Sequence, residues 1–276
     1  MEINRRNFLK DTLKLGTAGA ILPASLSAFA LPAAANPGEG LHILQPEGKN
    51  RFAGRPKVLF FDVNETLLDL EPLKVQVNTL LGNKDLGTLW FTSMLQYAFV
   101  TSLGRQYADF GTVGAAALEM IAANHGISLK PGDAMAVVKQ IMHLEPHPDV
   151  KEGLSLLKDA GYTLVSFTNS SNYAVNQQLQ HAGISSFFDR RISVQDFGRF
   201  KPDRDVYDWA ARCMGVSNRE SMLIAAHGWD IAGAAWAGWQ SAFIARAGQQ
   251  IFPLAPQPQL YENNLTALAQ ALTEMR

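Results

Sequence analysis

The chain of 276 residues contains one cysteine, Cys213, which excludes an internal disulfide and a zinc site built from several cysteines. Only 18% of the residues are charged, and no block of Lys or Arg occurs beyond the N-terminal region. A nucleic acid is therefore not an expected partner, because binding to phosphates needs clustered basic side chains. Beyond the N-terminal region no apolar run approaches about 18 residues, so no membrane span is expected in the mature chain.

The N-terminus resembles a twin-arginine export signal. Arg5 and Arg6 precede "NFLK", and a weakly apolar segment ending in small residues follows. We expect cleavage after Ala30 or Ala35, which makes residues 1–35 a signal peptide and residues 36–56 a linker rich in Gly, Pro and charge. The alternative is the basic start of an amphipathic helix. The signal implies the twin-arginine export machinery as a partner and a periplasmic or secreted location.

Strand-like and helix-like segments alternate after the linker. Five apolar runs, among them "KVLFF" and "TLVSF", are typical of parallel strands covered on both faces. Helical segments separate them, one with Asp149 as its expected N-cap. The rhythm predicts an α/β fold with a doubly wound parallel sheet.

One region interrupts this rhythm. Residues 71–143 read as helices with no convincing strand, so we interpret them as an inserted helical cap. Residues 57–70 and 144–276 then form the α/β core. A cap inserted after the first strand would overhang the carboxyl ends of the strands, where open α/β sheets bind ligands.

Polar side chains follow several of the predicted strands. Asp62 follows the first strand, Thr168 and Asn169 the second, Lys201 lies beyond the third, and Asp230 follows the fourth. Singly, each could be a turn cap, a helix cap or a solvated charge. In a parallel sheet all of them converge on one edge, which favours a common site.

The phrases "FDVNETLLDL", "FTNSS", "RFKPDRDVY" and "AAHGWDIAGAAWAG" occur in an order that resembles the haloacid dehalogenase (HAD) superfamily, and specifically its type II L-2-haloacid dehalogenase branch. The resemblance implies that Asp62 is a nucleophile that forms a covalent ester with substrate carbon. It implies that Lys201 keeps Asp62 ionised, that Thr66 orients it, and that Asp230 positions or deprotonates water. Related enzymes often pair through the cap, so a homodimer is one expected assembly.

The resemblance also implies a binding site for a small anionic substrate. Thr168 and the main-chain amides of Asn169 and Ser170 would hold the anionic group at a helix start, and Tyr207 would line the site. HAD phosphatases use a second acid two residues after the nucleophile. Here that residue is Asn64, and a halide leaving group needs no proton. Asn64 therefore favours cleavage of a carbon–halogen bond. The resemblance to the dehalogenase branch implies that no metal and no cofactor is needed.

Several positions depart from the dehalogenase pattern. The branch has a cap arginine that binds the substrate carboxylate and the departing halide, but alignment on Trp90 puts Phe91 there. Ala225 and His227 stand where Ser and Asn are usual, and Glu65 replaces a small glycine. These departures leave the substrate in question.

Phe91, His227 and Trp229 are further candidates for contact with the substrate. The plainer alternative is that His227 is a core or loop histidine and that the two aromatic residues pack the cap on the core. Two other functions stay open besides the dehalogenase: a magnesium-dependent phosphatase or phosphonatase-like hydrolase, and a catalytically inactive protein that binds an anion.

Overall fold

The computed structural model describes residues 54–274. The predicted signal peptide, residues 1–35, and most of the predicted linker, residues 36–56, lie outside the described residues. Within the described part, no helix is both long and apolar enough to cross a membrane. The elements follow one another in the order β1 (Val58–Phe61), α1 (Glu71–Leu81), α2 (Leu86–Leu103), α3 (Phe110–Asn124), α4 (Asp133–Val138), η2 (Lys139–His143), α5 (Val150–Asp159), β2 (Thr163–Thr168), α6 (Asn172–His181), η3 (Ser185–Phe187), β3 (Arg190–Ser193), η4 (Val194–Asp196), α7 (Arg204–Cys213), η5 (Asn218–Glu220), β4 (Ser221–Ala225), α8 (Gly228–Trp236), β5 (Gln240–Ile244), β6 (Leu260–Glu262) and α9 (Leu265–Thr273), where η marks a short 3-10 helix.

The strands form a parallel sheet in the order β3-β2-β1-β4-β5-β6. β1 pairs with β2 on one side and with β4 on the other, so that Phe60 lies beside Val165 and Leu223. Every residue of β1 and of β4 is buried. Helices cover both faces of the sheet, which explains why these strands are apolar without alternation. The predicted fold class, a doubly wound parallel α/β sheet, is confirmed.

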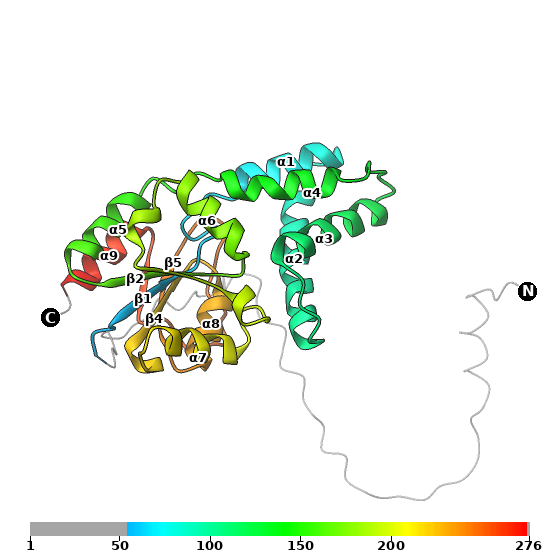
Figure 1. Cartoon of the computed structure of the whole chain (residues 1–276). Helices are drawn as coiled ribbons and strands as arrows, with labels where there is room; N and C mark the ends of the chain where they lie inside the picture. The colour runs from blue at the N-terminus through cyan, green and yellow to red at the C-terminus, as the bar shows by residue number, and fades with distance from the viewer. Residues whose placement is uncertain (1–53, 275–276) are drawn as a thin grey trace, which may run out of the picture. The chain divides into compact units, whose positions relative to one another are not determined.

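Two groups of helices flank the sheet. Figure 1 shows α5, α6 and α9 on one face and α7 and α8 on the other, and the pairs α5–α9 and α7–α8 are in contact. α8 is rich in small residues because α7 lies close to it. A Cβ atom at Gly233 would lie only 2.5 Å from the hydroxyl oxygen of Tyr207. The glycine therefore makes room for the Tyr207 side chain against the middle of α8.

The helices from α1 to η2 lie between β1 and α5 in the chain, over the range interpreted above as the cap. α2 is apolar on all sides, as expected for a helix that packs against both α1 and α3. On it, Trp90 is buried and its indole N–H donates to the carbonyl oxygen of Gly114 on α3 at 2.8 Å. This contact fixes the part of α2 that carries Phe91.

One expectation about local structure needs correction. The sequence predicted five strands, but β6 is a sixth, and its three residues are too few to give a recognisable apolar run. Asp149 is the N-cap residue of α5, as predicted, although its side chain makes no cap hydrogen bond. It accepts instead from Arg246 Nη1 at 2.7 Å and from the Leu265 N–H at 2.6 Å. The carboxylate thus ties α9 and the segment after β5 to the core.

Candidate active site

The loop after β1 carries the candidate nucleophile. The N–H of Asp62 donates to the carbonyl oxygen of Ile224 at 3.1 Å, so this residue still extends the pairing of β1 with β4. The Leu67 N–H then donates to the Val63 carbonyl at 2.9 Å and closes a tight turn. Within the turn, Glu65 has a φ of +59°, in the left-handed region that favours glycine. The turn places Asp62 and Glu65 in one buried cluster.

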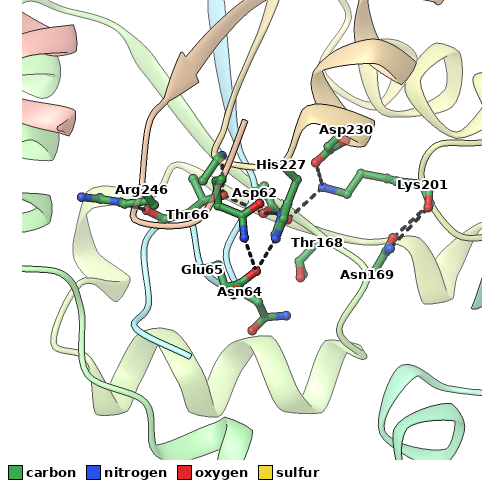
Figure 2. Close-up of polar contacts among 12 residues, drawn as sticks. Asp62, Asn64, Glu65, Thr66, Thr168, Asn169, Lys201, His227, Asp230 and Arg246 are labelled. Carbon is green, nitrogen blue, oxygen red and sulfur yellow. Dashed lines mark hydrogen bonds and ion pairs between the residues drawn. The ribbon is translucent and has the colours of Figure 1, made fainter. Parts of the chain in front are cut away.

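The two oxygens of the Asp62 carboxylate have different neighbours (Figure 2). Oδ1 accepts a hydrogen bond from Lys201 Nζ at 3.1 Å. Oδ2 accepts from Thr66 Oγ1 at 2.7 Å and lies 3.0 Å from His227 Nδ1. Burial raises the pKa of Asp62, but the charges and hydrogen bonds of Lys201 and His227 outweigh it, and the pKa lies well below its usual value. Asp62 is therefore ionised at neutral pH.

Lys201 links the two candidate catalytic carboxylates. Its fully buried ammonium donates to Asp62, to Asp230 Oδ2 at 2.5 Å and to the Phe167 carbonyl at 3.0 Å, which uses all three N–H bonds. The side chain of Asn169 fixes its main chain, accepting from the Lys201 N–H at 3.0 Å. Burial lowers the pKa of Lys201, but the two carboxylates raise it above the usual value. In the resting site Lys201 is thus a buried cation at neutral pH.

Asp230 lies in the first turn of α8 and is fully buried. Its Oδ1 accepts from the Tyr207 hydroxyl at 2.6 Å, while its Oδ2 faces Lys201. Burial, the largest cause, and the like charge of Asp62 raise the pKa of Asp230, and Lys201 offsets only part of this. A carboxylate with a raised pKa is better suited than Asp62 to accept a proton.

Asn64 links the loop after β1 to α6 and to the loop that precedes α6. Its Nδ2 donates to Ser170 Oγ at 3.2 Å, and its Oδ1 accepts from Gln178 Nε2 at 2.7 Å. The Ser170 N–H donates to Thr168 Oγ1 at 3.1 Å. This N–H and the side chain of Asn169 are thus engaged within the protein. The contact of Thr168, Asn169 and Ser170 with an anionic substrate stays a prediction.

His227 bridges Asp62 and Glu65. Its Nδ1 faces Asp62, and its Nε2 lies 2.8 Å from Glu65 Oε2. Glu65 also accepts hydrogen bonds from Lys74 and, at 3.2 Å, from Gln249. Burial lowers the pKa of His227, but the two carboxylates outweigh it and raise this pKa to about 9. His227 is therefore an imidazolium at neutral pH.

Aromatic side chains from cap and core enclose this histidine. The indole of Trp229 stacks on His227 with ring centroids 5.2 Å apart, and the Phe91 ring lies at 6.2 Å. Phe99 packs edge-on against Trp229 at 5.5 Å. Phe91, at the position where the resemblance leads to an arginine, thus presents an apolar surface beside the imidazolium.

Comparison with known proteins agrees with the residues found at this site. Residues 56–238 match the family described as haloacid dehalogenase-like hydrolase. The chain belongs to this family. It is 28% identical over 211 residues to a (S)-2-haloacid dehalogenase of Pseudomonas fluorescens, covering 76% of this chain and 93% of that protein. It is 27% identical over 175 residues to haloacetate dehalogenase H-2 of Moraxella sp. (strain B), covering 63% and 78%.

A solved structure shares the fold. The L-2-haloacid dehalogenase of Xanthobacter autotrophicus with chloropropionic acid covalently bound superposes with a TM-score of 0.73 at 22% identity. The match covers 80% of this chain and 100% of that one.

The donor set of this haloacid dehalogenase-like hydrolase does not fit a magnesium ion. Within residues 54–274, no three or more His, Cys, Asp or Glu side chains group so as to hold a metal. Asp62 and Asp230 are both bound by Lys201 Nζ, which lies where a cation between them would be needed. Asn64 Oδ1 is engaged by Gln178. Magnesium prefers six oxygen ligands, including carboxylates that are free to bind it.

Several residues of the site were not among the sequence candidates. Arg246, just after β5, donates from Nη2 to the Thr66 carbonyl at 3.0 Å and also pairs with Asp149. It holds the end of the nucleophile loop and lies beside Thr66 at the left of Figure 2. The sequence marks Glu65 only as a departure from the dehalogenase pattern, and it gives no sign of Lys74. The one available signal was the acid itself, because a glutamate within an apolar stretch needs a buried partner.

Proposed function

We propose that this protein is a hydrolase that releases halide from small 2-haloacids through a covalent ester on Asp62. We expect it to prefer the (S) enantiomers. The observation that carries the proposal is an ionised, buried Asp62 beside Lys201, with Asn64 in place of an acid. The named relatives are dehalogenases of this substrate class. They support the proposal at 27–28% identity.

In the first step Asp62 attacks the carbon that carries the halogen. The carbon–halogen bond breaks and its electron pair leaves with the halide, which is a weak base and takes no proton. Lys201 and His227 keep the nucleophile ionised without occupying every lone pair of its oxygens. No cofactor is required for this displacement.

In the second step water attacks the ester at Cγ of Asp62. Asp230 accepts the water proton, consistent with its raised pKa, and Tyr207 and Lys201 fix its orientation. The departing oxygen takes a proton from Lys201 Nζ, which is hydrogen-bonded to Asp62 Oδ1, and Asp230 can return one at 2.5 Å. The products are a 2-hydroxy acid and an Asp62 carboxyl group that contains the water oxygen. This carboxyl group releases the remaining water proton to solvent, which regenerates the carboxylate.

The alternatives have less support. A magnesium-dependent phosphatase or phosphonatase needs an acid for its leaving group and free carboxylates for the metal, and Asn64 and Lys201 stand against both. An inactive anion-binding protein needs no ionised nucleophile. Burying Asp62, Lys201 and Asp230 together costs free energy, and buried charges with shifted pKa values are typical of catalytic sites.

The test is halide release from (S)- and (R)-2-chloropropionate and from chloroacetate by the full chain and by Asp62→Asn. We expect release by the natural protein and none by the variant, with a mass increase on a peptide containing Asp62 after rapid quenching. Equal release by Asp62→Asn would exclude the covalent mechanism. Phosphoester turnover that EDTA abolishes would support the phosphatase instead.

We also propose that the protein is exported by the twin-arginine route and acts in the periplasm or outside the cell. Arg5 and Arg6 followed by "NFLK" and the small residues before Ala30 and Ala35 support this. In a bacterial host, the double variant Arg5→Lys, Arg6→Lys should stay in the cytoplasm while the natural chain reaches the periplasm.

We further propose that two chains pair through the cap. Light scattering on the purified protein tests whether it is a dimer.

A further inference from the structure

Six buried or nearly buried charges form a continuous chain of alternating sign. The order is Asp230, Lys201, Asp62, His227, Glu65 and Lys74. Asp62, Lys201 and Asp230 already have roles in the proposed reaction. Glu65 and His227 do not, although they are two of the positions where the sequence departs from the dehalogenase pattern. In the fold these two departures contact one another at 2.8 Å.

The neighbours of His227 require a proton on both ring nitrogens. Nε2 faces a carboxylate oxygen of Glu65 and Nδ1 faces a carboxylate oxygen of Asp62, and an ionised carboxylate only accepts hydrogen bonds. Glu65 is itself kept ionised by Lys74 and His227, which hold its pKa below the usual value despite its burial. His227 is therefore a positively charged donor aimed at Asp62.

The hydrogen bonds on Asp62 decide which of its oxygens attacks. Thr66 Oγ1 accepts the Ala226 N–H at 2.9 Å, so its own hydrogen is directed at Asp62 Oδ2. His227 Nδ1–H donates to the same oxygen. Oδ2 thus has two donors, whereas Oδ1 has one, Lys201. Oδ1 is the freer oxygen and becomes the ester oxygen, which leaves Oδ2 as the carbonyl oxygen of the ester.

We propose that His227, kept protonated by Glu65, is a charged oxyanion donor that acts in the hydrolysis of the Asp62 ester. The inference rests on the proposed function. When water attacks Cγ, the electron pair of the carbonyl moves onto Oδ2, and the imidazolium and the Thr66 hydroxyl stabilise this charge. When the intermediate collapses, the pair returns and the bond between Cγ and Oδ1 breaks, releasing the hydroxy acid. His227 contacts the reacting oxygen and is a catalytic residue, whereas Glu65 is a positioning residue.

The two steps should depend on His227 in opposite ways. In the first step Asp62 loses its negative charge, so a cation bound to it stabilises the starting state and does not speed the attack. In the second step charge returns to Oδ2, so the same cation lowers the barrier. Removal of one donor of this kind slows a reaction roughly 10²- to 10³-fold.

The experiment measures halide and hydroxy acid separately in a rapid-quench time course with (S)-2-chloropropionate. For His227→Leu we expect a burst of about one halide per site, turnover roughly 10²- to 10³-fold slower, and accumulation of the Asp62 adduct by mass spectrometry. His227→Asn keeps a neutral donor near the place of Nδ1 and should recover part of the turnover. His181→Asn is the matched control, because His181 pairs with Glu145 at a more exposed position and should behave like the natural chain.

Glu65→Gln tests the positioning role. The variant keeps the hydrogen-bond partner but removes the charge that holds the proton on His227, so hydrolysis of the ester should fail at lower pH than in the natural chain. An equal loss of burst and turnover in His227→Leu without any adduct would overturn the proposal, as would an unchanged pH profile in Glu65→Gln. If His227→Leu does not fold, His227→Asn and Glu65→Gln still decide. No halide and no adduct with the natural protein would remove the proposed function itself.

Discussion

Because His227 is buried between two carboxylates, we expect the free energy of unfolding to fall between pH 7 and pH 9. Burial lowers the pKa of His227, and Asp62 and Glu65 raise it to about 9 from the usual 6.5. In this range the folded protein keeps a proton that the unfolded chain has released. The stabilisation is therefore complete below pH 6.5 and lost as pH rises through about 9. The difference corresponds to about 3 kcal/mol, of which about 2 kcal/mol disappears between pH 7 and pH 9.

Urea unfolding of the full chain at several pH values measures this loss, with His227→Asn as the control that cannot titrate. The other His, Lys and Tyr side chains with shifted pKa values titrate outside this pH window. The pKa of His147 is lowered by burial, and the pKa values of Lys201 and Tyr207 are raised, so the latter two matter only above about pH 10. A free energy of unfolding that is flat from pH 7 to pH 9, or that falls equally in His227→Asn, would refute the reasoning.

Three further predictions concern the cap, the loop support and the metal. Arg246→Met should lower the free energy of unfolding by about 3 kcal/mol in urea, because it strips the Thr66 carbonyl of its donors and leaves Asp149 without its ion pair, and Arg246→Lys should recover only part. Phe91→Arg should slow halide release, because it adds a cation beside the imidazolium of His227. Adding His227→Asn to this variant should restore kcat/KM for halide release, which a double-mutant cycle detects. Halide release should be unchanged by EDTA, and a loss that magnesium reverses would contradict the proposed reaction.

The core of the fold could be predicted because its signals are local. Each central strand is a short apolar run followed by turn residues, and the first one, "KVLFF", is β1 almost to the residue. β6 could not be found in this way, because it is short and half-buried and is a strand only through its pairing with β5. The side-chain contacts of Asp149 could not be predicted for a similar reason. A capping residue is read from its neighbours in sequence, but Arg246 is 97 residues away.

The site residues also divide into those that sequence order places and those that depend on contacts between distant parts of the chain. The polar residues after consecutive parallel strands must meet at one edge of the sheet, so Asp62, Lys201 and Asp230 could be placed together from sequence order alone. The partner of Glu65 could not be placed, because His227 lies 162 residues further along the chain. The left-handed backbone at Glu65 was also hidden, since glutamate gives no sign of it.

The departures from the dehalogenase pattern are best understood as one change. An arginine at position 91 would meet the imidazolium of His227, whose ring centroid is 6.2 Å from that of Phe91, so the loss of one cation and the gain of the other are coupled. In this chain a cation, His227, lies beside Asp62 Oδ2, whereas the dehalogenase pattern has a cation in the cap for the substrate carboxylate. Binding of the haloacid should therefore be weak, whereas hydrolysis of the ester should be fast. We expect a high KM for the natural protein and an Asp62 adduct on only a small fraction of its sites in the steady state. An adduct on most sites would show that the cation does not serve the second step.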